Sequence, residues 1–370
     1  MKSLKLVLPV LIPILPATPP ALPAQEVLNW SDFELCNDCE LEATELVRLG
    51  DADGPGIIEG EHVRVVWDEE LGYLHFLPGD TRIKIFDHDG TFLREIGGEG
   101  DGPGEFRGIG DVHVIDGRIV VLDMIKSALV ILSPAGEYIT RHSYRLPETG
   151  PITPVGQDRI VVTTTTWRTR VIEHPLHLVD LSSGAITLRF GAANEGAEVT
   201  GLQWNFGKRV AASVSSRPGT VWWGWIATPA VQEWSVEGEF LRDFDGDLPW
   251  FPEIYEEPDL AREPPATLLR ELAVDGDDNL WMLIRTADPE WDEVPMEQGR
   301  GGPYPAPNTE DDYFDIRLDV FNLRERRHLG GHVWDGYTPA LLNRGGEPAV
   351  YVLEYSRAMV PQIVVYGVRE

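Results

Sequence analysis

The sequence has few lysines and, after its first 24 residues, no apolar run long enough to cross a bilayer. Lysine and arginine together number 31 against 61 aspartates and glutamates, and the formal net charge is −30. A surface with this charge repels phosphate backbones and anionic lipid headgroups. We therefore expect no nucleic-acid partner and no stable membrane insertion.

Several catalytic signatures are also missing. The chain has no Gly-x-Ser-x-Gly elbow, no His-Glu-x-x-His helix and no glycine-rich phosphate loop before a helix. The weak metal candidates are the pairs His174/His177 and His328/His332 and the acidic stretch 275–278. On strands or turns these histidine spacings do not reliably bring two imidazoles together, and a hairpin turn explains the aspartates. We predict no metal and no cofactor.

Residues 1–24 have the pattern of a cleaved secretion signal. Lys2 and Lys5 give a positive start, a short apolar stretch follows, and Ala24 precedes the preferred cleavage point. Prolines within the apolar stretch are atypical, so an uncleaved anchor and a plain apolar tail stay open as alternatives. The expected location is the periplasm or the extracellular space.

The two cysteines, Cys36 and Cys39, lie close together in Cys-Asn-Asp-Cys. In an oxidising compartment a local disulfide is the first expectation. A metal site would need further ligands, and a redox-active pair would need a helix start after a strand. Because the loop is very short, such a disulfide is expected to act as a small staple.

A repeat of strand, tight turn and strand dominates the rest of the chain. Short runs of Val, Ile, Leu and Trp alternate with Gly, Asp and Pro turns, which is typical of many short strands. The turn glycines are Gly90, Gly136, Gly184 and Gly238. A fifth copy, 317–330, lacks the glycine, and a sixth begins at 362 and meets the end of the chain.

Each copy follows two further strand-like runs, so one unit holds four antiparallel strands, the composition of a propeller blade. The last unit lacks its outer strand, whereas 44–49 reads as an outer strand without a blade. Pairing of 44–49 beside 362–368 would close the ring. The sequence thus predicts an all-β, six-bladed β-propeller over 43–370, after a signal peptide (1–24) and an N-terminal segment (25–42) with the cysteines.

The stretch GEGDGPGEF (98–106), followed by RIVVLD (118–123), resembles the NHL-repeat pattern of secreted bacterial six-bladed propellers. In this crossover Gly102 and Gly104 can take positive φ, and Phe106 is expected to plug the blade interface. Asp123 is expected to be a buried hydrogen-bonding carboxylate. The resemblance implies a scaffold used by many binding proteins and some enzymes, so it leaves function open.

The longest predicted loops fall on one face of this propeller. Connections between first and second strands are short, whereas the opposite face carries the insertions 192–206, 248–266 and 286–312. Long loops on the rim of a rigid scaffold commonly carry binding sites.

Cations recur in the second-to-third loops of this face, although the chain has few of them. They are Arg82, Lys126, Arg168, Arg170, Arg285 and Arg357. Arginine suits carboxylate or phosphate ligands, but each cation can equally pair with a local carboxylate. The candidate ligand site consists of Arg168, Arg285 and Arg357, walled by Trp250, Trp291 and Tyr355.

The function that these features favour is that of an exported, non-catalytic binding propeller. Its ligand would be an anionic small molecule, a glycan, or a peptide or protein partner. The alternative is a metal-dependent hydrolase, lactonase or lyase with its site at the central channel. A structural role in the cell envelope is a third possibility.

Overall fold

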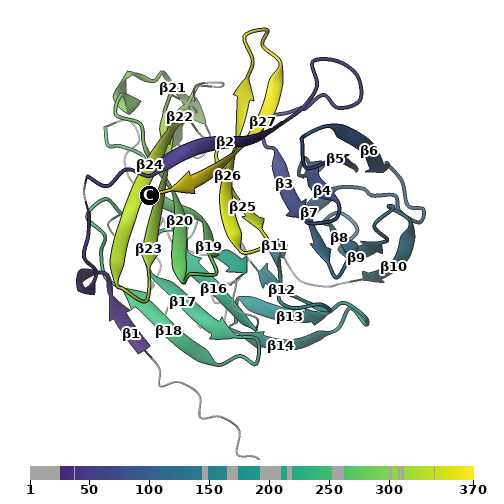
Figure 1. The fold of residues 1–370 in the computed structure, drawn as a ribbon, viewed down its shortest axis with the longest axis horizontal. Helices are drawn as coiled ribbons and strands as arrows, with labels where there is room; N and C mark the ends of the chain where they lie inside the picture. The colour runs from purple at the N-terminus through teal and green to yellow at the C-terminus, as the bar shows by residue number, and fades with distance from the viewer. Residues whose placement is uncertain are drawn as a thin grey trace, which may run out of the picture.

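The computed structural model describes residues 26–36, 38–143, 149–164, 174–191, 210–214, 219–251, 262–299, 302–306, 309, 312–336 and 338–370. The predicted signal peptide, Arg168 and Arg170 lie outside these residues. Six antiparallel blades of four strands each surround a central axis (Figure 1), and one of them carries a fifth, parallel strand. The protein is a six-bladed β-propeller, as predicted.

The first three blades follow one another directly along the chain. Blade one comprises β3 (Arg64–Asp68), β4 (Gly72–Phe76), β5 (Arg82–Phe86) and β6 (Phe92–Gly97). Blade two comprises β7 (Ile109–Ile115), β8 (Arg118–Asp123), β9 (Ala128–Leu132) and β10 (Tyr138–Ser143). Blade three comprises β11 (Thr149–Pro154), β12 (Arg159–Thr164), β13 (Leu176–Asp180) and β14 (Ile186–Phe190).

The other three blades involve both ends of the chain. Blade four comprises β15 (Val210–Val214), β16 (Thr220–Trp225), β17 (Val231–Ser235) and β18 (Phe240–Asp245), joined by β1 (Glu26–Asn29). Blade five comprises β19 (Leu268–Val274), β20 (Asn279–Ala287), β23 (Phe314–Asn322) and β24 (Arg327–Asp335). Blade six comprises β25 (Ala340–Arg344), β26 (Glu347–Tyr355), β27 (Pro361–Arg369) and β2 (Glu42–Leu49).

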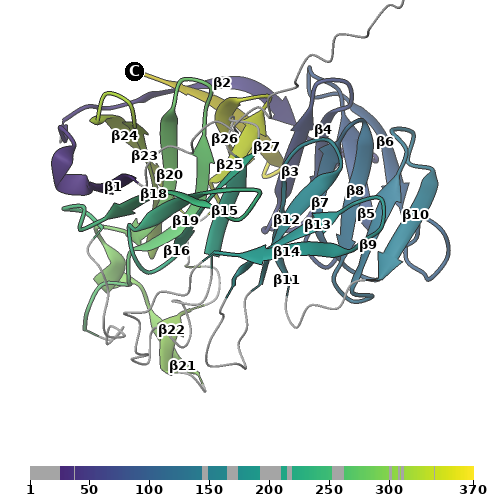
Figure 2. The same ribbon diagram turned by 90° about the horizontal axis from the view of Figure 1, so that it is seen from below.

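The innermost strands close a ring. β3, β7, β11, β15, β19 and β25 each contact the inner strand of the next blade, and β25 contacts β3. Between the second and third strands of blade five, the chain adds a turn of 3-10 helix (Trp291–Glu293) and a small hairpin. The hairpin strands are β21 (Met296–Gly299) and β22 (Gly302–Pro305), and in Figure 2 they project from one face of the ring.

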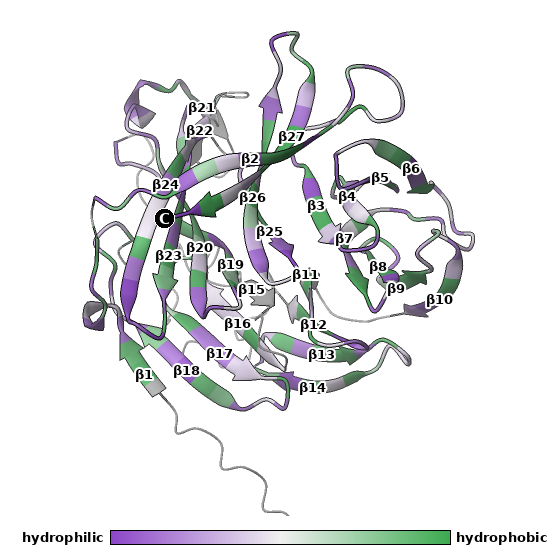
Figure 3. Cartoon of the chain, in the orientation of Figure 1, coloured by the Kyte–Doolittle hydropathy of each residue, from purple (hydrophilic) through white to green (hydrophobic). Residues whose placement is uncertain are grey.

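Burial explains the hydropathy pattern of the strands. The second and third strands are covered on both faces by neighbouring blades, so β9 is buried at every residue, whereas most of outer strand β10 is exposed. One apolar cluster joins β4 and β5 of blade one to β7, β8 and β9 of blade two. Figure 3 shows the resulting hydrophobic stretches and the mixed outer strands.

The turns between third and fourth strands follow the sequence prediction. Gly90 has a φ of 84°, and the other three turn glycines also have positive φ. In the fifth copy Arg326 occupies the turn with a φ of 54°, so a non-glycine residue takes the left-handed conformation.

The crossover after blade one agrees with its predicted role except at one residue. Phe106 is fully buried, and Gly104 has a φ of 76°. Gly102 does not take positive φ; its backbone N–H instead donates to Glu105 Oε2 at 2.8 Å. Asp123 is confirmed as a buried carboxylate, because it accepts the backbone N–H groups of Arg107 and Lys126.

The predicted ring closure is confirmed. β2 pairs antiparallel with β27, with Thr44 opposite Gly367 and Leu49 opposite Ile363. The N-terminal strand therefore supplies the outer strand that the last copy of the repeat lacks.

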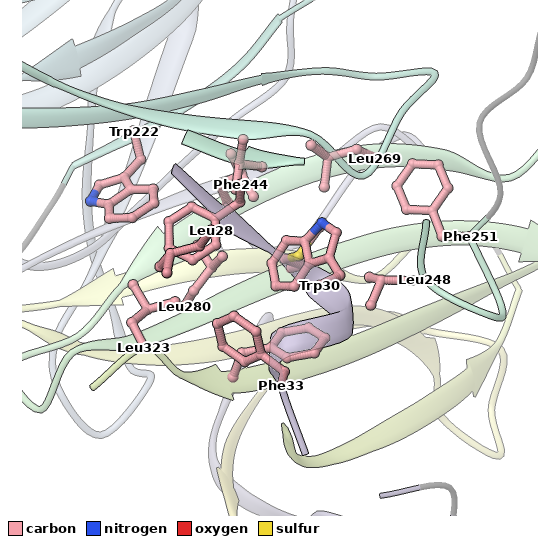
Figure 4. Packing of buried hydrophobic residues seen from close by; sticks show 14 of the residues in the cluster. Leu28, Trp30, Phe33, Trp222, Phe244, Leu248, Phe251, Leu269, Leu280 and Leu323 are labelled. Carbon is pink, nitrogen blue, oxygen red and sulfur yellow. The ribbon is translucent and has the colours of Figure 1, made fainter. Parts of the chain in front are cut away.

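The chain before β2 forms an N-terminal belt, residues 26–41, across two further blade edges. β1 adds to β18 in parallel, with Glu26 opposite Arg242, and Glu34 forms a backbone bridge to Arg327 of blade five. Trp30 is fully buried between blades four and five and donates its indole N–H to Pro229 O at 3.1 Å. Figure 4 shows Trp30 among Phe33, Phe244 and Leu248.

The predicted Cys36–Cys39 disulfide is present in this belt, over blade five. Beneath it lies the fully buried carboxylate of Asp319. Asp319 accepts hydrogen bonds from Arg317, from Trp250 Nε1 at 2.8 Å and from His328 Nε2 at 3.0 Å. The other ring nitrogen of His328 lies 2.9 Å from Cys36 O, so this imidazole links Asp319 to the belt. No helix among the described residues is long and apolar enough to cross a membrane.

Candidate functional site

The central channel is a cavity of about 1510 Å³ lined by the inner strands. Its volume exceeds the roughly 300–1,000 Å³ of ordinary small-molecule sites. The described lining includes seven carboxylates and four arginines. These side chains are Asp68, Glu69, Asp111, Glu271, Asp275, Asp277 and Glu347, and Arg64, Arg270, Arg344 and Arg369.

An ion pair crosses the channel beside blade six. Arg64 of β3 lies 2.8 Å from Glu271 of β19, and both of these strands flank β25. The second carboxylate oxygen of Glu271 accepts the backbone N–H of Leu341 in β25 at 2.6 Å. The pair therefore ties three inner strands together. The Arg64 side chain is 41% exposed and lines the cavity.

A second carboxylate repeats part of this arrangement on the other side of blade one. Asp111 of β7 accepts the backbone N–H of Ile152 in β11 at 2.8 Å. Like Glu271, it belongs to an inner strand and satisfies an edge amide of the next blade, which would otherwise face the channel. The negative charge of Asp111 also acts on Arg64, so the two carboxylates share one cation.

Tyr351 completes this charged cluster. It is buried and hydrogen-bonds Arg64, and burial raises the pKa of its hydroxyl above the ordinary value. The hydroxyl therefore stays protonated at neutral pH. The cluster presents one guanidinium, two carboxylates and one phenol to the cavity.

Sequence reasoning missed these channel residues, although a signal was present. Arg64, Asp111 and Glu271 pair with Phe76, Leu122 and Leu283, which hold equivalent places on the second strands of their blades. An alignment of the inner strands would have shown a charged residue recurring at one position of otherwise apolar runs.

The six residues of the sequence-predicted site do not line the channel where they are described. Arg357 and Tyr355 are exposed at the β26–β27 turn, and Trp291 lies half-buried in the blade-five insertion. Arg285 lies near the end of β20, with its guanidinium carbon 4.1 Å from the centroid of the Phe314 ring. Arg168 lies outside the described residues, so the site as a whole stays a prediction.

Two members of that set contact opposite faces of the blade-five sheet. Trp250 packs against the apolar cluster that contains Ile284, and its ring lies 4.5 Å from the guanidinium carbon of Arg317. Arg285 follows Ile284 directly, so its side chain leaves the other face of the strand. The structure thus gives Trp250 a contact with Asp319 and does not bring it together with Arg285.

The two other recurrent cations that the structure describes have local partners. Arg82 lies 3.0 Å from Glu95, and Lys126 donates to Glu105 O at 3.0 Å. Both cations thus make local contacts within the fold, which the sequence analysis gave as the alternative to ligand binding.

A group of carboxylates lies at the end of blade five away from the channel lining. Asp315 is buried, and Asp288 and Asp335 lie close to it. Burial, together with these two negative charges, raises the pKa of Asp315 to about 6. Within the described ranges, no group of three or more His, Cys, Asp or Glu side chains is arranged to hold a metal ion.

A second, smaller cavity of about 440 Å³ lies beside blade one. His75 lines it with one ring nitrogen on Arg64 O at 3.2 Å, and burial lowers the pKa of this imidazole to about 4. Lys84 lines it as well and donates to Ile57 O. Lys84 thus holds the crossover that enters blade one, whereas His75 contacts the first residue of β3.

Comparisons with known proteins support the fold. Residues 79–141 match a family model described as a six-bladed β-propeller, DUF5128. The match covers β5 and β6 of blade one and nearly all of blade two, so the chain is similar to that family over this stretch. A search of curated proteins found no match.

Two solved structures resemble nearly the whole chain. A member of the DUF4221 family from Bacteroides vulgatus aligns with a TM-score of 0.61 at 10% identity, covering 90% of this chain and 100% of its own. A Bacteroides fragilis protein described as exported aligns with a TM-score of 0.57 at 11% identity, covering 93% of this chain and 99% of its own. At these identities the likeness shows the fold alone.

Proposed function

We propose that this protein is an exported, non-catalytic binding propeller whose central channel takes a small polar ligand. The observation that carries the proposal is the partly exposed Arg64 side chain, held by Glu271 inside a cavity of about 1510 Å³. A guanidinium that an ion pair holds in place is a preorganised partner for a carboxylate. The site proposed from the geometry thus lies in the channel, whereas the site predicted from the sequence lies among the outer loops.

The charges around Arg64 define the ligand further. Glu271 and Asp111 outnumber this one cation, and carboxylates outnumber arginines in the whole described lining. A simple anion would meet net repulsion there, whereas a zwitterion can place its carboxylate on Arg64 and its ammonium near Asp111. We therefore propose a ligand that carries both groups, such as an amino acid or the ends of a short peptide.

Calorimetric titration with three matched probes tests this proposal. Trialanine with free ends carries both charges, N-acetyl-trialanine only the carboxylate, and trialanine amide only the ammonium. We expect trialanine to bind at least about tenfold more tightly than either blocked form, which corresponds to about 1.4 kcal/mol. Arg64→Met combined with Glu271→Gln removes both charges of the ion pair together, so neither is left unpaired.

Arg357→Met is the matched control, because it removes an exposed arginine from the predicted loop site. The proposal expects weakened trialanine binding in the channel variant, unchanged binding in R357M, and partial retention in Arg64→Lys. If N-acetyl-trialanine binds best and R357M abolishes it, the anion site predicted from the sequence is correct instead. If no probe binds the wild-type protein, the channel proposal is wrong.

Export and the NHL-type repeat form part of the same proposal. The Cys36–Cys39 disulfide and the signal-like start support export. The GEGDGPGEF motif of 98–106, with Phe106 buried as its role requires, supports the NHL resemblance. Mass spectrometry of the exported protein tests the first part: a chain beginning at Gln25 with oxidised cysteines is expected.

A further inference from the structure

The N-terminal belt shows that a blade edge of this propeller can accept an additional strand. β1 pairs in parallel with β18 over Arg242–Asp245. The belt is extended and acidic: residues 26–40 contain five carboxylates and no lysine or arginine. Leu28, Trp30 and Phe33 anchor it in the core. A segment that alternates acidic residues with buried apolar residues can therefore add to the edge of a blade in this fold.

The belt runs along the outer edges of blades four and five, and β2 is itself the outer strand of blade six. Among the described residues, β6, β10 and β14 pair on one side and present their other edge outward. An open edge offers a row of backbone donors and acceptors to another chain.

β10 differs from β6 in its charge and from β14 in its exposed apolar residues. Like β14, it carries no carboxylate, although the chain has a net charge of −30. Its Tyr138 and Ile139 are 42% and 50% exposed, and Arg141 is exposed as well. β6 contains Glu95 beside Arg82, and β14 has no large exposed apolar residue.

The strand register allows β10 to be aligned with β18 residue by residue. Both outer strands have an irregularity after their first residue, so Thr140–Ser143 of β10 corresponds to Arg242–Asp245 of β18. The stretch of β18 contains Asp243 and Asp245 and still accepts β1, whose one carboxylate, Glu26, lies opposite Arg242. The stretch of β10 has Arg141 and Ser143 at those places, so its charge is better suited to an acidic strand.

We propose that the outer edge of β10 is a docking surface for an acidic, extended segment of a partner protein, which adds as a fifth strand to blade two. Backbone hydrogen bonds along Thr140–Ser143 would supply affinity, and Arg141 with the exposed Tyr138 and Ile139 would select acidic segments with apolar residues. This surface lies on the rim of the ring and is independent of the channel.

A labelled peptide with the sequence of residues 26–35 and blocked ends is the probe. Its binding to the full chain is measured by fluorescence anisotropy, and the bound site is located by hydrogen exchange. Because the covalently attached belt has a high effective concentration, the peptide should not displace it from β18. We expect slowed exchange within 140–143 and about fivefold weaker binding to Arg141→Glu.

Arg189→Glu on β14 makes the same charge change on the neighbouring blade and should alter the affinity less than about twofold. A peptide with its acidic residues replaced by lysine should bind poorly. The proposal is wrong if the peptide does not bind, if R189E weakens it as much as R141E, or if protection falls on 242–245. The Arg64 variants should leave this binding unchanged, so this test and the channel test fail separately.

Discussion

At the scale of single residues, the buried polar groups lie mainly where two chain segments must be held together. Asp319 joins blade five to the belt, and Glu271 joins three inner strands. Each is a carboxylate whose oxygens meet donors from different elements. Such groups cost desolvation, but once they are fully hydrogen-bonded they specify one arrangement of their partners.

Asp319→Ala should destabilise the protein strongly. The substitution leaves Arg317 and the Trp250 and His328 rings without their shared acceptor, and breaking a buried charged network typically costs about 3–5 kcal/mol. Urea unfolding measures the loss. Asp277→Ala, on an exposed turn, should change the free energy of unfolding by less than about 0.5 kcal/mol. Equal losses in the free energy of unfolding for the two substitutions would show that the Asp319 network stabilises the fold no more than an exposed carboxylate does.

Asp315→Asn should stabilise the protein at pH 8 and have little effect near pH 4. The folded-state pKa of Asp315 is raised to about 6 from the ordinary value of 3.8, so the folded protein takes up a proton between these values. Stability contributed by this group is therefore lost as pH rises through that window. The gain at pH 8 should be of the order of 1 kcal/mol. Urea unfolding at both pH values, with Asp89→Asn as an exposed control, checks this, and an equal gain at both would contradict it.

At the scale of elements, the belt contributes more than the disulfide within it. Deleting residues 25–50 removes β1, the buried Trp30 and the closing strand β2, so the melting temperature should fall sharply. Replacing Cys36 and Cys39 by serine opens a loop of only a few residues, and the entropic loss should be small. Calorimetry compares the two variants. A truncated protein that melts like the full chain would exclude closure by the N-terminal strand.

The repeat made most of the fold predictable from the sequence. Its periodic turn glycines and the incomplete last copy fix blade number, strand order and the pairing of 44–49 with the final strand. The belt could not be foreseen, because residues 26–41 have no repeat partner and dock through Trp30 and through backbone contacts to histidines that the sequence offered only as weak metal candidates.

The candidate site was less predictable for a related reason. Loop length drew attention to Arg285, Arg357 and Trp250, yet strand parity places Trp250 and Arg285 on opposite faces of one sheet. The channel cluster joins residues of β3, β7 and β19 that lie far apart in sequence. Only the ring geometry brings such residues together.

At the scale of the whole molecule, a chain with a net charge of −30 favours the approach of cations and disfavours anions. The channel arginines act at short range within that field. A zwitterion is compatible with the long-range field and with the channel arginines. It has no net charge that the field would repel, and its carboxylate can bind Arg64 at short range. The charges that line the channel are therefore compatible with the zwitterionic ligand that we propose.

Hydrogen exchange of the full chain with and without trialanine tests this central claim most directly. The measurement reports which backbone amides the ligand protects, without any substitution in the protein. The account predicts slowed exchange in the inner strands around Arg64, Asp111 and Glu271, and unchanged exchange at the loops near Arg285 and Arg357. Protection confined to those loops, with the inner strands unaffected, would contradict it.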